Sequence, residues 1–379
     1  MVESVRILLT GGGSGGHVYP LVAVAEELKK QAPQAQIYYF GPKSALNAEF
    51  VNLGIGVYNI ASSKLRRYFS LANFIDVPKF FWSLVQAFFK LYFLMPDVVF
   101  SKGGPGALSV ILAAKFYLIP VIIHESDAVP GLTNRLSAKL AKRIGISFAE
   151  AAKYFPKNKT ALVGNPLRSG LLASVNLTQA QAKKDLRFET NKPLILVLGG
   201  SQGAQVINSL IWDNFLSILE ISQVYHQVGD LNLSEIKDFI AGAPQEIRLA
   251  GDQYKFTGFF DLPSLREALF AADLVISRAG AGAIFEIAAF GKPSILVPLE
   301  GAANGHQRVN AYAYAETGAA EVIEEENFTI NILKTQIKDI LGNAAKMGEM
   351  ATAAKAFAKP DTAQVLAKEI LFLSGARFI

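Results

Sequence analysis

Two glycine-rich segments contain the residue types that bind charged ligands. The first covers residues 11–16 and ends directly before His17, and the second covers residues 199–204. Glycine allows backbone amides and a helix N-terminus to approach a phosphate closely, because no side chain stands in the way. A neutral imidazole beside such a loop can accept a proton from a hydroxyl. These residues predict binding of a phosphate-bearing ligand and base catalysis by His17. A histidine that only caps the helix or packs in the core is the alternative interpretation of His17.

The first segment fits the G-x-G-x-x-G pattern through Gly11, Gly13 and Gly16. In a nicotinamide enzyme, an acidic residue at the end of the second strand holds the ribose. In this chain the corresponding run, residues 37–40, leads into Gly41 and Pro42. The sequence therefore argues against a nicotinamide oxidoreductase. A glycine turn that only packs a helix on a strand is the alternative interpretation of the loop.

A further candidate lies in the second half of the chain. Residues 277–283 are rich in glycine and alanine and lead into a predicted helix that carries Glu286. A carboxylate can accept hydrogen bonds from two neighbouring hydroxyls of a ligand. The residues around Glu286 are apolar, so a solvated surface glutamate is the weaker interpretation.

The elements that position these residues alternate along the chain. Apolar runs that do not alternate strictly with polar residues are typical of buried parallel strands, and helical patterns lie between these runs. The predicted strands cover residues 5–9, 36–40, 98–100, 121–123, 194–198, 274–276 and 294–297. This order predicts an α/β chain with doubly wound parallel sheets.

The succession of strand, glycine loop and helix occurs twice, at the beginning and in the middle of the chain. Such a repeat predicts two Rossmann-like domains rather than one long sheet. The predicted domains are residues 1–163 and 164–358, and residues 359–379 form a last helical segment.

The composition excludes several classes of protein. With 379 residues, 51% hydrophobic and 18% charged, the chain is neither disordered nor fibrous. A net charge of +5 is too small and too dispersed to indicate a nucleic-acid-binding protein. The absence of cysteine excludes disulfides, thiolate metal ligands and cysteine nucleophiles.

One stretch, residues 64–95, combines lysine and arginine with many aromatic residues. Its apolar part, residues 80–95, is shorter than the roughly 20 residues that span a bilayer and contains Gln86 and Lys90. Basic side chains suit anionic headgroups, and aromatic side chains suit the interface. We therefore predict peripheral docking on an anionic membrane surface. A helix whose apolar residues all face the core is the alternative.

Six segments, in order, resemble the MurG family of membrane-associated N-acetylglucosaminyltransferases, which complete the lipid-linked disaccharide of peptidoglycan. The segments are residues 11–17, 124–134, 164–168, 199–204, 278–286 and 306–307. The resemblance implies a GT-B fold, with two Rossmann-like domains facing across a cleft. The N-terminal domain would take the lipid acceptor and the C-terminal domain UDP-GlcNAc, while the final helix would cross back to the first domain.

The resemblance also implies roles for individual residues. His17 is the candidate base, and Asp127 is an alternative or an assistant. The implied UDP-GlcNAc ligands are Ser14, Gly15, Arg168, Gly200, Ser201, Gln202, Glu286, His306 and Gln307, with Glu286 on the ribose and Gln307 on the sugar. The implied acceptor ligands are Gly13, Gly16, Gly104, Glu125 and Asn134.

The chain departs from the family pattern at two places in the acceptor half. Ser126 and Asp127 follow His-Glu where Gln-Asn is common, and the loop of residues 103–109 lacks the aromatic residue that often follows its glycines. The nucleotide sugar is therefore better defined by the sequence than the acceptor.

The expected reaction is an inverting transfer of N-acetylglucosamine from UDP-GlcNAc to the muramyl sugar of the undecaprenyl-linked precursor, lipid I, which gives lipid II. No cofactor or metal is expected, because the chain has neither a D-x-D nor an H-E-x-x-H motif. No secretory signal pattern is found, so we expect a peripheral protein at the cytoplasmic face of the cell membrane, with cell-wall synthesis proteins as further partners. The alternatives are transfer to another lipid, such as a diacylglycerol, and a non-catalytic nucleotide-sugar-binding protein.

Overall fold

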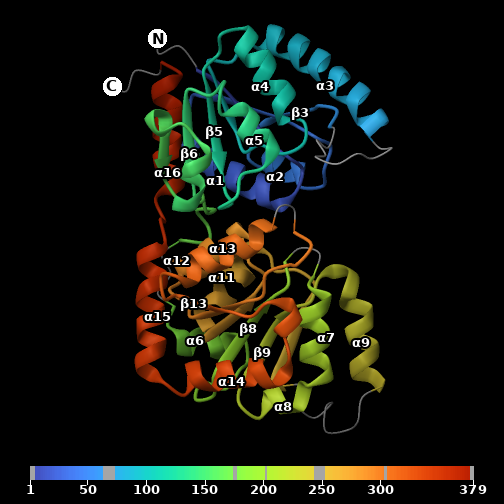
Figure 1. Cartoon of the computed structure of the whole chain (residues 1–379), viewed down its shortest axis with the longest axis vertical. Coiled ribbons are helices and arrows are strands. Elements are labelled where there is room, and N and C mark those ends of the chain that lie inside the picture. Colours follow the sequence, from blue (N-terminus) through green and yellow to red (C-terminus); the bar gives the residue numbers. More distant parts are fainter. Residues whose placement is uncertain are drawn as a thin grey trace. The chain divides into compact units, whose positions relative to one another are not determined.

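The structure is a computed structural model that describes residues 5–62, 73–173, 177–200, 203–242, 252–302 and 305–375. The chain divides into two compact units (Figure 1). The first unit comprises Met1–Ser169 with Lys359–Ile379, and the second comprises Gly170–Ala358.

The first unit contains a seven-stranded parallel sheet in the order β3-β2-β1-β4-β5-β6-β7. Its strands are β1 (Arg6–Thr10), β2 (Gln36–Gly41), β3 (Gly56–Asn59), β4 (Val98–Ser101), β5 (Val121–Glu125), β6 (Arg143–Ile146) and β7 (Thr160–Leu162). Both faces of the central strands are covered. Ile7 and Leu9 belong to one core cluster and Leu8 to the other, which explains why this strand is apolar without alternation.

Helices cover the two faces of this sheet. They are α1 (Gly15–Gln31), α2 (Asn47–Asn52), α3 (Asn73–Leu94), α4 (Ala107–Phe116), α5 (Leu132–Ser137) and α16 (Thr362–Leu373), with short 3-10 turns at Ala149–Tyr154 and Lys157–Lys159. The last helix, α16, packs beside α1 and buries Leu366 and Ile370 in the same cluster as β1. The Thr362 hydroxyl donates a hydrogen bond to the Val163 carbonyl at 2.6 Å, where α16 begins.

The second unit contains a six-stranded parallel sheet in the order β10-β9-β8-β11-β12-β13. Its strands are β8 (Leu194–Leu198), β9 (Gln223–Gln227), β10 (Tyr254–Thr257), β11 (Leu274–Ser277), β12 (Ser294–Leu296) and β13 (Ala320–Val322). Its helices are α6 (Gln179–Asp185), α7 (Gln205–Asp213), α8 (Phe215–Leu219), α9 (Leu233–Gly242), α11 (Leu262–Ala271), α12 (Ala281–Ala289), α13 (His306–Ala315), α14 (Ile330–Leu341) and α15 (Ala344–Phe357), with 3-10 turns at Asp230–Asn232 and Glu325–Asn327.

The predicted α/β fold with two Rossmann-like domains is confirmed. All seven predicted strands are present, because each is a continuous apolar run buried inside a sheet. The strands that the sequence did not reveal include the short edge strands β3 and β7, whose residues are partly exposed. An exposed edge does not require a continuous apolar run, so these strands leave no strong signal.

Candidate functional site

Each sheet has one position where the strand order reverses, and the glycine loops lie there. In the first unit this position is between β1 and β4, and in the second it is between β8 and β11. Helices leave adjacent strands in opposite directions at such a point, which opens a crevice beyond the carboxyl ends of the strands. Both units thus place a glycine loop where open α/β sheets bind ligands.

In the first unit the loops that follow β1 and β4 are joined. The Gly12 amide donates a hydrogen bond to the Gly103 carbonyl at 2.9 Å. The His17 ring lies against both loops, because a Cβ atom on Gly12 would be 2.4 Å from its Cδ2 atom and one on Gly104 would be 2.6 Å from the same atom. The absence of side chains at Gly12 and Gly104 therefore creates the space that the imidazole occupies.

His17 is the third residue of α1 and is partly exposed. Its ring is nevertheless enclosed by the two loops, and this burial, together with the positive charge of Lys102, lowers the pKa of His17 from 6.5 to about 4. The charge of Asp127 acts in the opposite direction. The imidazole is therefore neutral near pH 7 and can accept a proton. It lies in the same unit as Gly13, Gly16 and Gly104, which the sequence assigned to the acceptor.

Glu125 and Asn134 hold the loop that follows β5. The buried Glu125 carboxylate accepts hydrogen bonds from the Asp127 amide at 3.0 Å, the Gly131 amide at 3.2 Å and the Asn134 side chain at 3.0 Å. Burial and the nearby charge of Asp127 raise the pKa of Glu125. Both predicted acceptor ligands thus contact each other and determine the shape of the loop that carries Asp127.

Beside this loop lies a buried lysine that the sequence analysis did not single out. The Lys102 ammonium donates to His124 Nδ1 at 2.6 Å and to the Ser126 hydroxyl. Lys102 directly precedes Gly103 and is 2% exposed. The signal in the sequence that could have revealed it is a lysine placed between a buried apolar strand and a glycine loop.

Three residues assigned to UDP-GlcNAc lie in the first unit, at the N-terminus of α1. Ser14 precedes α1 as its N-cap and Gly15 begins it. The Arg168 guanidinium stacks on the Tyr19 ring at 4.1 Å from its centre, and the Tyr19 ring in turn lies close to Gly15. Arg168 thus adds a positive charge near a helix N-terminus, which favours an anionic group.

In the second unit the glycine loop follows β8 and is attached to β9. The Gln227 side chain donates to the Gly200 carbonyl at 2.9 Å, and the Gly203 amide donates to the same carbonyl at 3.1 Å. Ser201 and Gln202, which the sequence assigned to the donor, lie outside the described residues. The described part of the loop leads into α7, whose N-terminus is a second place for an anion.

The neighbouring helix α12 begins just after β11 and carries Glu286 in its second turn, partly buried. A Cβ atom on Gly280 or Gly282 would meet no other atom within 4 Å, so the space beside the N-terminus of α12 is open. The Arg278 guanidinium, which precedes this helix, pairs with Glu325 at 2.5 Å and donates to the Val297 carbonyl at 3.2 Å.

The remaining donor candidates lie at the start of α13. His306 is its first residue, ten positions beyond the end of β12. The Gln307 side chain accepts a hydrogen bond from the Leu299 amide at 3.1 Å, and the Asn310 side chain donates to the Ala279 carbonyl at 3.2 Å. These bonds connect α13 to the loops that follow β12 and β11. Gly200, Glu286, His306 and Gln307 thus share one unit.

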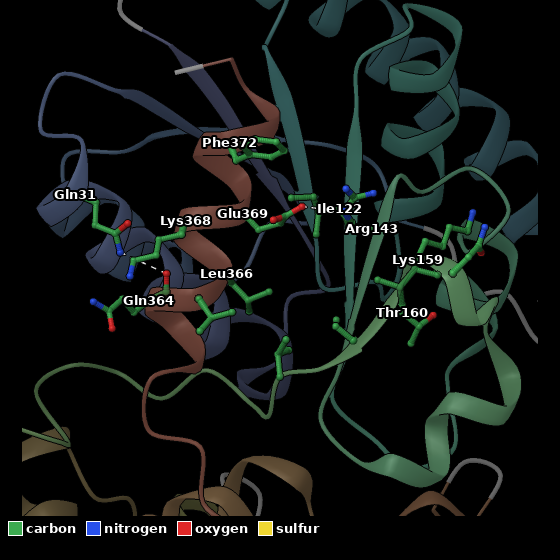
Figure 2. A pocket seen from close by; sticks show the side chains of 16 residues that line it. Gln31, Ile122, Arg143, Lys159, Thr160, Gln364, Leu366, Lys368, Glu369 and Phe372 are labelled. Carbon is green, nitrogen blue, oxygen red and sulfur yellow. Dashed lines mark hydrogen bonds and ion pairs between the residues drawn. The ribbon is translucent and has the colours of Figure 1, made fainter. Parts of the chain in front are cut away.

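A cavity of about 1080 Å³ lies elsewhere in the first unit, between α16 and the strands β6 and β7 (Figure 2). Phe372 and Leu366 line one side, and Arg143, paired with Glu369 at 2.9 Å, lines the other. None of the predicted site residues that the structure describes lines it. We therefore assign the site to the loops at the strand ends and not to this cavity.

Helix α3 carries an apolar surface that we call the α3 patch, and it lies beside α4 on the outside of the first unit (Figure 1). The patch consists of Val77, Phe81, Trp82, Val85, Phe89, Tyr92, Phe93, Phe116 and Leu118. Phe93 is 80% exposed and Leu118 82%. The alternative in which all apolar residues of this stretch face the core is therefore wrong. Three basic residues of the stretch predicted to dock on the membrane, Lys64, Arg66 and Arg67, lie outside the described residues.

The described part of the chain has neither a membrane-spanning helix nor a cluster of metal ligands. No helix there is both long and apolar enough to cross a membrane. No group of three or more His, Asp or Glu side chains there is arranged to hold a metal ion.

Comparison with known proteins gives consistent matches. Residues 7–146 match the model of the glycosyltransferase family 28 N-terminal domain, and residues 194–366 match that of the family 28 C-terminal domain. A relative from Clostridium perfringens, strain SM101, is 37% identical over 91% of this chain and 92% of its own length. One from Geobacter metallireducens is 34% identical over 97% and 98%. Both are named UDP-N-acetylglucosamine--N-acetylmuramyl-(pentapeptide) pyrophosphoryl-undecaprenol N-acetylglucosamine transferase.

A solved structure is similar over the whole chain. The crystal structure of MurG from Acinetobacter baumannii has a TM-score of 0.73 and 26% sequence identity, covering 97% of this chain and 99% of that one.

Proposed function

The chain belongs to glycosyltransferase family 28 and, within it, to the MurG family of N-acetylglucosamine transferases, and we propose that it converts lipid I to lipid II. The acceptor is the undecaprenyl-linked muramyl pentapeptide, and the donor is UDP-GlcNAc. The observation that carries this proposal is the 37% identity over 91% of the chain to a transferase of that name.

The reaction is a single displacement. The muramyl hydroxyl oxygen attacks the anomeric carbon of UDP-GlcNAc, the bond from that carbon to the diphosphate oxygen breaks, and UDP leaves. A base removes the hydroxyl proton as the new bond forms, so that the configuration inverts. Orientation of the two substrates and stabilisation of the charge on UDP provide most of the catalysis.

We assign the acceptor to the first unit and the base to His17. The neutral imidazole is held between Gly12 and Gly104, at the carboxyl ends of β1 and β4. Glu125 and Asn134 maintain the loop that presents Asp127 on the same side. Asp127 is the rival base, since its charge acts on the pKa of His17.

We assign the nucleotide sugar mainly to the second unit. The N-termini of α7 and α12 both point to the crevice beyond β8 and β11, and helix N-termini stabilise the negative charge of a diphosphate. Glu286 would accept hydrogen bonds from the ribose hydroxyls, and Gln307 would contact the sugar. Backbone amides at these helix N-termini would stabilise the charge that develops on UDP. Contacts of Ser14, Gly15 and Arg168 with the donor stay a prediction.

We further propose that the first unit docks on the cytoplasmic face of the cell membrane through the α3 patch. The exposed apolar side chains of α3 recur every four residues, at Val77, Phe81, Val85, Phe89 and Phe93, and therefore lie along one face of the helix. Exposed apolar residues grouped on one face indicate an interaction surface. The exposed Lys79 on the same helix offers attraction to anionic headgroups. A polyprenyl-linked acceptor is available only at a bilayer, which agrees with this placement.

Product analysis tests the proposed function. The purified protein is incubated with labelled UDP-GlcNAc and with either lipid I or a diacylglycerol in vesicles, and the labelled product is identified by mass spectrometry. Labelled lipid II is expected. A glycosylated diacylglycerol would establish the other lipid acceptor, and binding of UDP-GlcNAc without turnover would establish a non-catalytic protein.

Two variants distinguish the candidate bases. His17→Ala is expected to lower kcat by roughly 100-fold or more, with the affinity for UDP-GlcNAc unchanged, because His17 lies in the other unit. Near-normal turnover of His17→Ala, together with a collapse of kcat in Asp127→Asn, would transfer the role of base to Asp127.

A further inference from the structure

Among the described residues of the acceptor half, Lys102 is the most deeply buried lysine, arginine, aspartate or glutamate, and the mechanism above does not use it. It directly follows β4 and is 2% exposed. Its ammonium lies 2.6 Å from His124 Nδ1, contacts the Ser126 hydroxyl and lies 3.5 Å from Asn165 Oδ1. An ammonium has three donors, and each of them has an acceptor here.

These contacts fix the orientation of the neighbouring groups. His124 Nε2 lies 2.8 Å from the Gly164 carbonyl, which can only accept, so the proton is on Nε2 and Nδ1 accepts from Lys102. The Ser126 hydroxyl donates to Asn165 Oδ1 at 2.8 Å. Lys102 therefore connects the ends of β4 and β5 to the segment that follows β7, and Ser126 is the residue directly before Asp127.

The charge of Lys102 is as important as its hydrogen bonds. Burial of an unpaired ammonium is costly, and here the carboxylates of Glu125 and Asp127 are the opposite charges that act on it. Burial lowers the pKa of Lys102 below its usual range, although these two carboxylates act in the opposite direction. Burial is also the main cause that lowers the pKa of His17 and His124, and the positive charge of Lys102 lowers both further.

We propose that Lys102 is a positioning residue for the transfer reaction: its buried ammonium holds the Ser126–Asp127 turn beside the loop of Gly103 and Gly104, against which the His17 ring lies. The ammonium opposes protonation of His17 and so keeps the base ready for the acceptor hydroxyl. This inference rests on the proposed function. The charged groups that act on His17 are Lys102, which follows β4, and Asp127, in the loop that follows β5. Glu125 acts on Lys102, His124 contacts it, and the Tyr39 hydroxyl of β2 donates to the Gly11 carbonyl at 3.4 Å.

Lys102→Met tests this proposal, since methionine keeps the length of the stem and removes the charge and the donors. Titration of the four histidines in the labelled full chain by NMR, with His17→Gln to assign the signal, measures the pKa of His17 without any need for turnover. Without the positive charge, this pKa is expected to rise by at least about one pH unit. The pKa that limits kcat/KM for lipid I on the acid side should rise with it, so that Lys102→Met loses more activity at pH 5 than at pH 8.

Three further variants separate position from simple packing. Lys183→Met removes a lysine of similar burial, 4% exposed and paired with Asp273 at 2.7 Å in the second unit, and is expected to cost stability without moving the pKa of His17. Lys102→Arg is expected to restore the acid limb. Lys102→Met combined with Asp127→Asn is expected to return the pKa of His17 toward the wild-type value, because the opposing charge is then also absent.

The outcomes are distinct. An unchanged pKa of His17 in Lys102→Met, or an equal change in Lys183→Met, would show that Lys102 only fills space and would overturn the proposal. If the wild-type protein makes no lipid II, the proposed function fails, while the NMR titration still decides whether Lys102 controls the charge of His17.

Discussion

Substitution of Gly104 by alanine tests whether the two glycine loops exist to accommodate His17. Gly104 has a φ of +86°, and a Cβ atom there would lie 2.6 Å from His17 Cδ2, 2.7 Å from His17 Nε2 and 2.9 Å from the Gly12 amide nitrogen. Real Cβ atoms do not approach other atoms so closely, and the Gly12 amide is attached to Gly103 by a hydrogen bond. The imidazole is therefore the group that must move.

The magnitude follows from two separate costs. A residue with a side chain in the left-handed region costs about 1–2 kcal/mol of stability. Displacement of the ring by about 1 Å from its productive place can cost on the order of 100-fold in rate. Gly104→Ala should therefore fold with reduced stability and lose on the order of 100-fold in kcat with lipid I.

Gly106→Ala is the matched control. Gly106 has a φ of +87°, so it carries the same backbone cost, but its nearest neighbours would be the Ala61 carbonyl oxygen at 3.6 Å and Ser62 Cβ at 3.7 Å. Thermal unfolding, calorimetry with UDP-GlcNAc and initial rates with lipid I are measured for both variants. Both variants should lose stability and keep donor affinity, and Gly104→Ala should lose more stability because its Cβ atom would also lie 2.9 Å from the Gly12 amide nitrogen. Only Gly104→Ala should lose the rate, and equal rates of the two folded variants would refute the role assigned to the loops.

Three further predictions concern the donor, the membrane and the pH dependence. Glu286→Ala should weaken UDP-GlcNAc binding by about 1–3 kcal/mol in calorimetry, and unchanged affinity in the folded variant would contradict the assignment of Glu286. The triple variant Lys79→Gln, Trp82→Ser and Phe89→Ser should co-sediment less with anionic vesicles, and wild-type binding should weaken at high salt. Leu231→Ser, at a leucine of the second unit that is even more exposed than Trp82 and Phe89, should leave binding unchanged. Burial lowers the pKa of His226 from 6.5 to about 3. As the pH falls below 6.5, the unfolded chain therefore takes up a proton that the folded chain does not. The free energy of unfolding should fall by roughly 1.5 kcal/mol between pH 6.5 and pH 5 because of this histidine. Urea unfolding of His226→Gln should show a correspondingly smaller pH dependence, and an unchanged one would refute this reasoning.

The sequence by itself determined the fold class and the family. The seven predicted strands are buried on both faces, so each requires a continuous apolar run that can be read directly from the chain. The two glycine loops follow β1 and β8 at short range, and their spacing to the next helix is a local property. The family segments are also local, which is why the activity could be predicted before any contact was known.

Only the tertiary structure decided how the acceptor half is built. Glu125 and Asn134, predicted as ligands, contact each other and hold a loop, and Lys102 contacts Ser126 from a different strand. The outward direction of the α3 patch likewise depends on which face α4 covers. Such arrangements depend on distances between residues that are far apart in the chain, and on the loss of water around buried charges, and neither is encoded in local spacing.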